Sequence, residues 1–173
     1  PVLAFNVALL AGMVLTGWAF CLLLRRWTGS WAAGYVAGSA AAFNPQVLVR
    51  LGHLQIMHAE FFALLLFALD RVLVSRRFKD ALWLGVGFAL QGLTSLYLLI
   101  FSVWMLLFAL AARVKEALRG GAGVIARLAF AALVAIVLLA PCLWAYQQLR
   151  SGSGLARGAE EQIAGSWADY LAT

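Results

Sequence analysis

The sequence predicts an all-α fold, a polytopic bundle of transmembrane helices. Its 173 residues are 65% hydrophobic and only 12% charged, with a mean hydropathy of +0.93, which excludes a water-soluble domain with a polar exterior. Apolar runs long enough to cross about 30 Å of hydrocarbon follow one another with short charged breaks. The basic residues gather in alternate breaks, as they do in helical membrane proteins.

The spans are predicted from the apolar runs and from one break inside the longest run. Residues 81–112 would make a single helix of about 48 Å, which is longer than the hydrocarbon is thick. The stretch "QGLTSLY" at 91–97 holds a glycine, two hydroxyl residues and a tyrosine, and we expect it to form a tight turn between two short helices. The six predicted spans are therefore 2–24, 31–48, 56–74, 81–94, 96–112 and 128–149.

The positions of the basic residues orient these spans. With six spans, 10 of the 13 lysines and arginines fall on one side of the membrane: Arg25, Arg26, Arg71, Arg76, Arg77, Lys79, Arg113, Lys115, Arg119 and Arg127. The positive-inside rule makes that side cytoplasmic. The net charge of +6 is then explained by contact with membrane lipid headgroups, and no nucleic-acid partner is indicated.

The remaining segments are placed on the outer side. These are residues 44–58, the turn at 91–97, and residues 150–173, read as the start of an outer loop. Because the chain begins at Pro1 without an initiator methionine and stops at Thr173 in a polar segment, we expect residues 1–173 to be a single transmembrane fragment of a larger protein. In the second span, Gly34 and Gly38 lie four residues apart and predict close approach of a neighbouring helix.

The segment "NPQVLVRLGHLQIMHAE" at 44–60 holds both histidines of the chain. Asn44-Pro45 should end the second span, since a residue before proline is disfavoured in a helix. If residues 53–60 begin the third helix, His53 and Glu60 lie within about 40° of each other on one face, while His58 points away.

Two interpretations of this polar segment remain open. Arg50, His53, Gln55 and His58 can be anchors at the level of the lipid headgroups, with Glu60 paired locally. Alternatively they form a phosphate or metal site, because arginine can hold a phosphate bidentately and histidine can donate to it or bind a metal. The spacing fits no recognised zinc pattern.

Several motifs of this chain resemble those of the GT-C superfamily, membrane glycosyltransferases that use polyprenyl-phosphate sugar donors. They are "FNPQVLVRLGHLQ" after a small-residue span, "DR" at the end of the next span, "RFKDA" at the start of another, and "LQGLTSLY" in the turn. The similarity covers roughly residues 15–105. The matched positions of the central motif are Arg50, Gly52, His53, Leu54 and Gln55.

The resemblance implies transfer of a sugar from a polyprenyl-phosphate donor to an acceptor at the outer face of a bacterial inner membrane. It implies a general base, an aspartate, in a loop upstream of residue 1. Arg50 and His53 would stabilise the leaving phosphate, and Gly52 would let the backbone turn so that His53 faces the site. Gln55 would bind a sugar hydroxyl, and Tyr97 would line the same cavity.

Residues 58–63, "HAEFFA", which come shortly after the central motif, depart from the family pattern. His58 and Glu60 therefore receive no role from the resemblance. They remain possible site residues on chemical grounds, as does Asp169 in the outer tail. The chemistry needs a carboxylate to take the proton of the acceptor hydroxyl, and cationic groups or a divalent metal to stabilise the leaving phosphate.

Two other functions share this composition, a multi-span transporter or lipid flippase and a non-catalytic membrane scaffold. A transporter normally has polar or broken helices near the midplane. Polarity at that depth is limited here to Asn6, Thr16 and Gln91, which we expect to be satisfied by the backbone or by neighbouring helices. The enzyme is therefore preferred.

Overall fold

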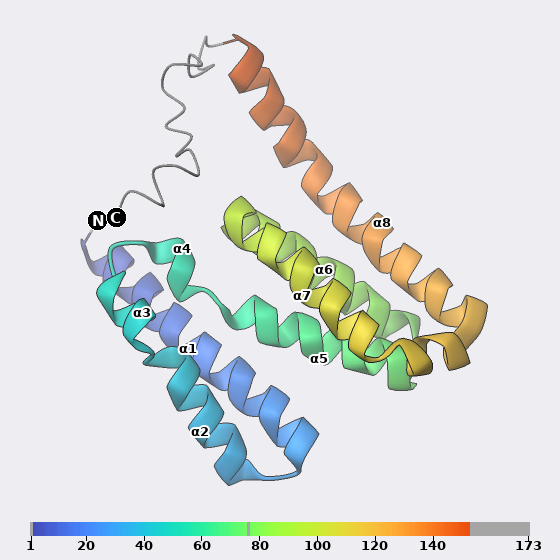
Figure 1. Ribbon diagram of the computed structural model, residues 1–173. Coiled ribbons are helices and arrows are strands. Elements are labelled where there is room, and N and C mark those ends of the chain that lie inside the picture. Colours follow the sequence, from blue (N-terminus) through green and yellow to red (C-terminus); the bar gives the residue numbers. More distant parts are fainter. Residues whose placement is uncertain (1, 76, 153–173) are drawn as a thin grey trace, which may run out of the picture. The chain divides into compact units, whose positions relative to one another are not determined.

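The computed structural model describes residues 2–75 and 77–152, and the side chains of these residues except at positions 46, 55 and 149–152. This part of the chain is helical, without strands (Figure 1). Its helices are α1 (Val2–Thr28), α2 (Trp31–Ala42), α3 (Pro45–Val49), α4 (Leu54–Met57), α5 (Glu60–Ser75), α6 (Phe78–Thr94), α7 (Leu96–Ala112) and α8 (Val114–Gly152). Residues 1–139 form one compact unit and residues 140–173 a second, of which the last part of α8 is described.

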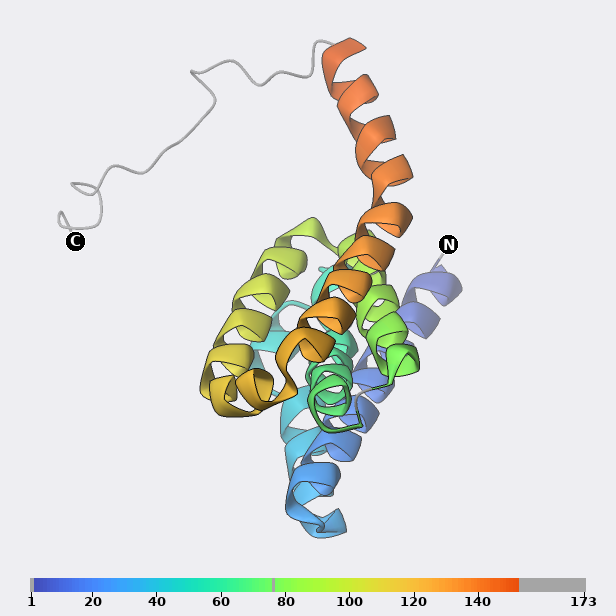
Figure 2. The same ribbon diagram turned by 90° about the vertical axis from the view of Figure 1, so that its right-hand side faces the viewer.

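Within the first unit the chain passes back and forth between two ends. The α1–α2, α5–α6 and α7–α8 turns lie at one end, called the basic end below, and α3, α4 and the α6–α7 turn lie at the opposite end (Figures 1 and 2). Asp70 lies near the end of α5 and accepts two hydrogen bonds, each of 2.6 Å. One comes from Arg26 Nε of α1 and the other from Arg113 Nη1 at the end of α7. Arg26 and Arg113, from two of the predicted basic segments, thus meet at the same carboxylate.

Helices α1 and α2 pack closely through their glycines. Ser30 caps α2, where its Oγ accepts the amide of Ala33 at 3.3 Å. A Cβ added to Gly34 would lie 2.7 Å from the carbonyl oxygen of Cys21, and one added to Gly38 would overlap the carbonyl oxygen of Gly17. The close approach predicted from these two glycines is confirmed.

The predicted span 31–48 consists of two helices. Helix α2 ends at Ala42, and Asn44 caps α3 by accepting the amide of Val47 at 3.0 Å, with Pro45 at the first helical position. Proline suits that position because its missing N–H would be unbonded there in any case. The break at Asn44-Pro45 is present, but residues 45–49 form a separate short helix.

The break predicted within 91–97 is present at Ser95. This residue is extended, with φ −162° and ψ 117°, and its Oγ accepts the amide of Leu98 at 3.3 Å, so it caps the start of α7. Helices α6 and α7 thus form a hairpin (Figure 1). One unbroken helix from 81 to 112 is excluded.

Helix α8 extends well beyond the predicted span 128–149. It begins at Val114 and bends at Gly121, whose φ of 53° and ψ of −147° are not helical. Past this bend it packs on α6 so closely that a Cβ on Gly85 would overlap the carbonyl oxygen of Ala131. Val124 and Ala131 belong to a core shared with α5 and α6.

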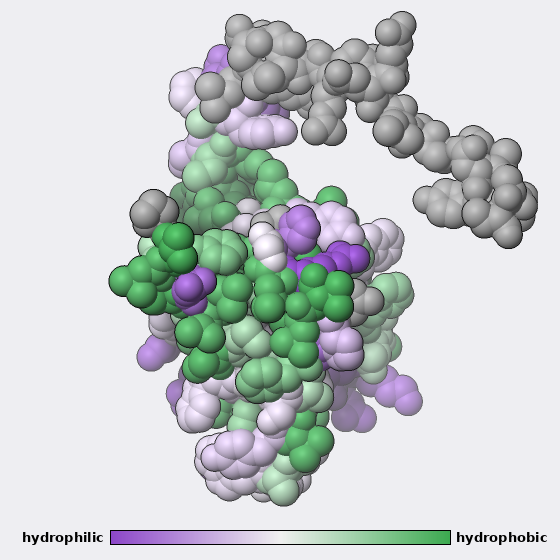
Figure 3. Space-filling model, turned by 90° about the vertical axis from the view of Figure 1, so that its left-hand side faces the viewer, coloured by the Kyte–Doolittle hydropathy of each residue, from purple (hydrophilic) through white to green (hydrophobic). Residues whose placement is uncertain are grey.

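Two helices in the described chain are long and apolar enough to cross a membrane, residues Val2–Thr28 and Val114–Gln148. Helix α7 is also strongly apolar but shorter, with 17 residues. Large apolar side chains are exposed on both long helices, for example Val14, Trp18, Ile125 and Ile136. The face seen in Figure 3 carries hydrophobic residues interspersed with hydrophilic ones.

Candidate functional site

The predicted phosphate ligands lie on a single turn between α3 and α4. The amide of His53 donates to the carbonyl oxygen of Arg50 at 2.9 Å, which closes a turn over residues 50–53. Gly52 lies inside this turn, but positive φ is found at Gly29 and Gly121 in the described chain and not here. The turn therefore does not need the conformational freedom of glycine that the resemblance suggested.

The side chains of Arg50 and His53 are both exposed. Within the described part of the chain, neither has a hydrogen-bond or ion-pair partner. A guanidinium and an imidazole on one turn, three residues apart, can address one anion together. We call this pair the Arg50–His53 turn.

Of the other predicted site residues, Tyr97 is described in full and Gln55 and Asp169 are not. Tyr97 is 66% exposed at the start of α7, with its ring edge-on to Phe101 at 4.9 Å between centroids. The start of α7 lies at the same end of the unit as the Arg50–His53 turn (Figure 1), and no hydrogen bond or ring contact joins Tyr97 to that turn among the described residues. The backbone of Gln55 lies in α4, while its side chain and all of Asp169 are outside the described residues.

Residues 57–60 form a buried joint between α4 and α5 that is anchored by α1. The Thr16 hydroxyl lies 3.0 Å from the Met57 carbonyl oxygen and 3.2 Å from Oε2 of Glu60, and can donate its proton to either. It also accepts the amide of Ala59 at 3.1 Å. A single hydroxyl from α1 thus bonds backbone groups that the interrupted helix leaves unpaired. We call this contact the α4–α5 joint.

The joint overturns the predicted arrangement of the two histidines. His58 Nδ1 lies 2.9 Å from Oε1 of Glu60, and His53 is separate and exposed. Residues 53–60 do not form one helix, since α4 ends at Met57 and α5 begins at Glu60, so angles counted along a continuous helix do not apply. The alternative in which Glu60 pairs locally is the one observed.

Glycine at position 12 allows α1 to reach the joint. A Cβ there would lie 2.9 Å from the Met57 carbonyl oxygen and 3.2 Å from Cε1 of His58. Glu60 is only 5% exposed and His58 is half-buried. The joint is therefore a packed element with its polar groups satisfied, and Thr16 is a residue whose contribution sequence reasoning missed.

Metal binding receives no support from the described residues. No three His, Cys, Asp or Glu side chains among them are grouped so that they could hold a metal ion. His58 and Glu60 make one such pair at the joint, and their contacting atoms already bond each other.

Gln91 departs from the expectation for polar residues at midplane depth. Its side chain is fully buried, and neither its amide nitrogen nor its oxygen has a hydrogen-bond partner within the described chain. The Thr16 hydroxyl is hydrogen-bonded, as expected, whereas the Gln91 amide has no hydrogen bond within the described chain. A buried amide without a partner is costly and is uncommon in folded proteins.

The basic end holds two ion-pair clusters that the sequence did not specify. In one, Asp70 bonds Arg26 and Arg113, and Arg113 also pairs with Glu116. In the other, Arg71 Nε donates to Oδ1 of Asp80 at 2.7 Å. The first cluster contains two cations and two carboxylates and is neutral.

Asp80 precedes the predicted span 81–94 and accepts two side-chain donors. Arg71 Nε donates to one of its oxygens and the Ser75 hydroxyl donates to the other, so both oxygens are occupied.

Comparison of the chain with protein-family models, with curated proteins and with solved structures found no significant match.

Proposed function

We propose that the chain is part of an integral membrane protein that crosses the bilayer six times, with its basic end in the cytoplasm. The two long apolar helices, the exposed apolar side chains and the grouping of basic residues at one end support this. Helices α5, α6 and α7 have 16 or 17 residues, about 25 Å, so they would cross near the lower limit of length. Helix α2 has 12 residues, about 18 Å, so the second crossing needs α3 as well.

Cysteine labelling in intact cells tests this topology. Cys142 is exposed and would react, so it is first replaced by serine, and Cys21 is buried. A cysteine introduced at Lys115 should resist an impermeant thiol reagent added from outside, while one introduced at Leu51 in the Arg50–His53 turn should be labelled. Ready labelling at position 115 would contradict the six-span arrangement.

We propose further that this protein is a glycosyltransferase that uses a polyprenyl-phosphate-linked sugar at the end opposite to the basic end. The observation that carries the proposal is the Arg50–His53 turn, where two exposed side chains suited to phosphate stand without partners in the described chain. Charged groups that stabilise the molecule are normally paired, as Asp70 and Asp80 are here. The side chains of Arg50 and His53 are exposed and have no partner in the described chain, so they are available to a ligand.

The chemistry needs a carboxylate that takes the proton of the acceptor hydroxyl and donors that stabilise the leaving phosphate. Arg50 and His53 supply the donors in this proposal, with Gln55 and Tyr97 at the sugar. Glu60 is buried and bonded to His58 and Thr16, so we assign it to the α4–α5 joint rather than to proton transfer. The base is then expected in the loop upstream of residue 1, as in the family that the motifs resemble.

Sugar transfer by the full-length protein tests the assignment. Arg50→Lys keeps the charge but loses the planar fork, and it should impair transfer far more than Arg77→Lys, a matched exposed arginine at the basic end. His53→Ala should reduce transfer by about 10²-fold without affecting membrane insertion, the effect typical of losing one donor to developing charge. Normal transfer by His53→Ala would leave this histidine as an interfacial anchor.

A transporter or lipid flippase is the second candidate, because Gln91 is a buried amide without a partner in the described chain. Such groups at midplane depth often mark a substrate path. Gln91→Leu removes the amide at similar volume. It should abolish translocation of a lipid-linked sugar if the protein is a transporter, and it should leave sugar transfer intact if the protein is the proposed enzyme.

A further inference from the structure

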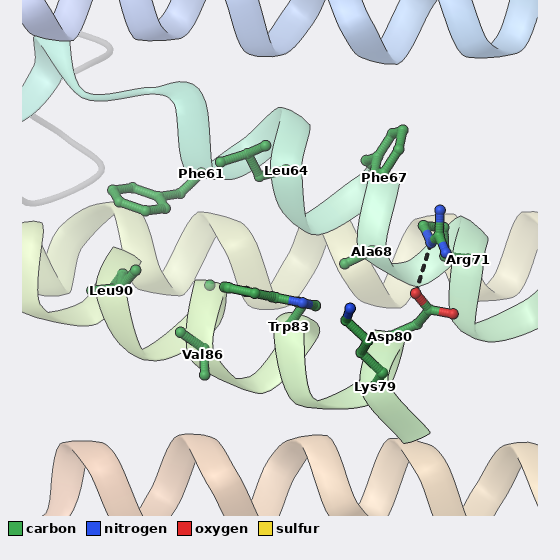
Figure 4. A pocket seen from close by; sticks show the side chains of 11 residues that line it. Phe61, Leu64, Phe67, Ala68, Arg71, Lys79, Asp80, Trp83, Val86 and Leu90 are labelled. Atoms are coloured by element: carbon green, nitrogen blue, oxygen red, sulfur yellow. Dashed lines mark hydrogen bonds and ion pairs between the residues drawn. The ribbon is translucent and has the colours of Figure 1, made fainter. Parts of the chain in front are cut away.

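A groove runs between α5 and α6, with charged residues at one of its ends. Its volume is about 500 Å³. Arg71, Lys79 and Asp80 stand at the basic end of the groove, and Phe61 and Leu90 stand at the other (Figure 4). Leu64, Trp83 and Leu90 are 41%, 59% and 43% exposed, so the groove is open to the surroundings along its length.

The groove matches a lipid in length and in polarity. Ten residues of α5 separate Phe61 from Arg71, which corresponds to about 15 Å along the helix, close to the hydrocarbon thickness of one leaflet. The walls along this distance are apolar, with the Trp83 ring lying lengthwise between the two ends (Figure 4). A ligand with an extended hydrocarbon chain fits this surface.

The charge at the basic end selects an anion. Both oxygens of Asp80 are already engaged by Arg71 and Ser75, so this carboxylate is not available to a ligand amine. Lys79 is exposed, and its ammonium has no ion-pair partner among the described residues. Arg71 donates to Asp80 through Nε, so its Nη1 and Nη2 can donate to a ligand. The three charged residues sum to +1, in contrast to the neutral Asp70 cluster nearby.

We propose that the α5–α6 groove binds an anionic phospholipid, with its phosphate at Lys79 and Arg71 and an acyl chain along Phe61, Leu64 and Trp83. Basic pockets between membrane helices at the cytoplasmic side bind such headgroups. The proposal rests on the membrane location proposed above. It does not depend on sugar transfer, which is assigned to the opposite end.

Native mass spectrometry of the purified full chain in detergent tests the proposal, with phosphatidylglycerol and phosphatidylcholine of identical acyl chains as probes. Phosphatidylglycerol should bind more tightly. Lys79→Ala should weaken its binding about fivefold, the effect of one cation at a lipid surface. Lys115→Ala, the other lysine of the chain, is exposed at the same end outside the groove and should leave the affinity unchanged.

A second pair of variants tests the groove itself. Gly87→Leu keeps every charge and fills the groove, and the nearest atom to a Cβ there is Leu65 Cδ2 at an ordinary 3.5 Å. Leu64→Trp fills it from α5 and replaces Gly87→Leu if that variant does not fold. Either should reduce phosphatidylglycerol binding. Unchanged binding would mean that the lipid associates with surface charge alone, which overturns the proposal.

Two further outcomes would also overturn it. Equal binding of the two lipids would show that the charged end does not select an anion. Displacement of phosphatidylglycerol by inorganic phosphate would show a site for free phosphate rather than for a lipid. Arg50→Lys should retain phosphatidylglycerol binding, so failure of the glycosyltransferase proposal and failure of this one are distinguishable. The labelling at positions 51 and 115 reports on membrane topology separately.

Discussion

The Arg50–His53 turn and the α4–α5 joint lie close together in the sequence and differ in exposure and in hydrogen bonding. The turn holds exposed side chains without partners in the described chain, whereas the joint buries Glu60 and bonds it to His58 and Thr16. Backbone bonding differs too, since the turn closes on itself and the joint depends on α1. Polar residues of one short segment can therefore serve stability or binding, and their partners decide which.

Glu60→Ala should produce the largest loss of stability in this comparison. The free energy of unfolding should fall by about 3 kcal/mol, because the hydrogen bonds of a buried carboxyl group are lost and half-buried His58 is left without its partner. Denaturant titration of the protein in detergent, followed by tryptophan fluorescence, measures this. The matched control is Glu116→Ala, whose carboxylate is 44% exposed and should contribute about 1 kcal/mol or less. Equal losses would remove the distinction between the joint and a surface ion pair.

Gly12→Ala adds one carbon at the α4–α5 joint, and Gly52→Ala adds one carbon in the Arg50–His53 turn. At Gly12 the new Cβ would lie 2.9 Å from the Met57 carbonyl oxygen, so α1 must shift and the free energy of unfolding should fall by about 2 kcal/mol. At Gly52 nothing lies within 4 Å and φ is not positive, so the change should stay within about 0.5 kcal/mol. Thermal unfolding of the two variants in the same detergent makes the comparison. A destabilised Gly52→Ala would mean that the turn is packed after all.

Thr16→Val removes one hydroxyl from the joint and keeps the side-chain shape. The free energy of unfolding should fall by about 1 kcal/mol, since the Ala59 amide and the Met57 carbonyl lose their bonds to Thr16. Thr28→Val on the same helix is the control, because the exposed Thr28 hydroxyl bonds Leu24 of its own helix and Ser30. It should have the smaller effect. If the order is reversed in denaturant titration, Thr16 does not anchor the joint.

His53→Ala should have the smallest effect on stability. With an exposed side chain that has no partner in the described chain, the change in free energy of unfolding should stay within about 0.5 kcal/mol. The same variant is expected to lose about 10²-fold in sugar transfer, so stability and activity should separate at this residue. Parallel loss of both in the purified protein would assign His53 to the fold.

Much of the helical architecture could be predicted because it depends on local chemistry. Ser95 ends α6 with its own backbone geometry and caps α7 with its own hydroxyl, so a glycine and two hydroxyl residues within one short stretch were a sufficient signal. Gly34 and Gly38 indicated a close helix contact because removing Cβ has one main structural use on an apolar helix. The basic end was predicted because arginines beside apolar runs gather on one side of a membrane.

The start of α5, which corresponds to the third predicted span, could not be predicted in this way. Counting residues from His53 assumed a continuous helix, which would place His53 and Glu60 on one face. Thr16 stands 41 and 43 residues away from Met57 and Ala59, yet its hydroxyl bonds both, so the helix can break between them without leaving their backbone groups unpaired. The sequence by itself indicated most of the helical segments and the basic residues that lie between them. Only the tertiary structure decided that Glu60 is buried with His58 while Arg50 and His53 stay exposed, because that depends on a contact with a distant helix.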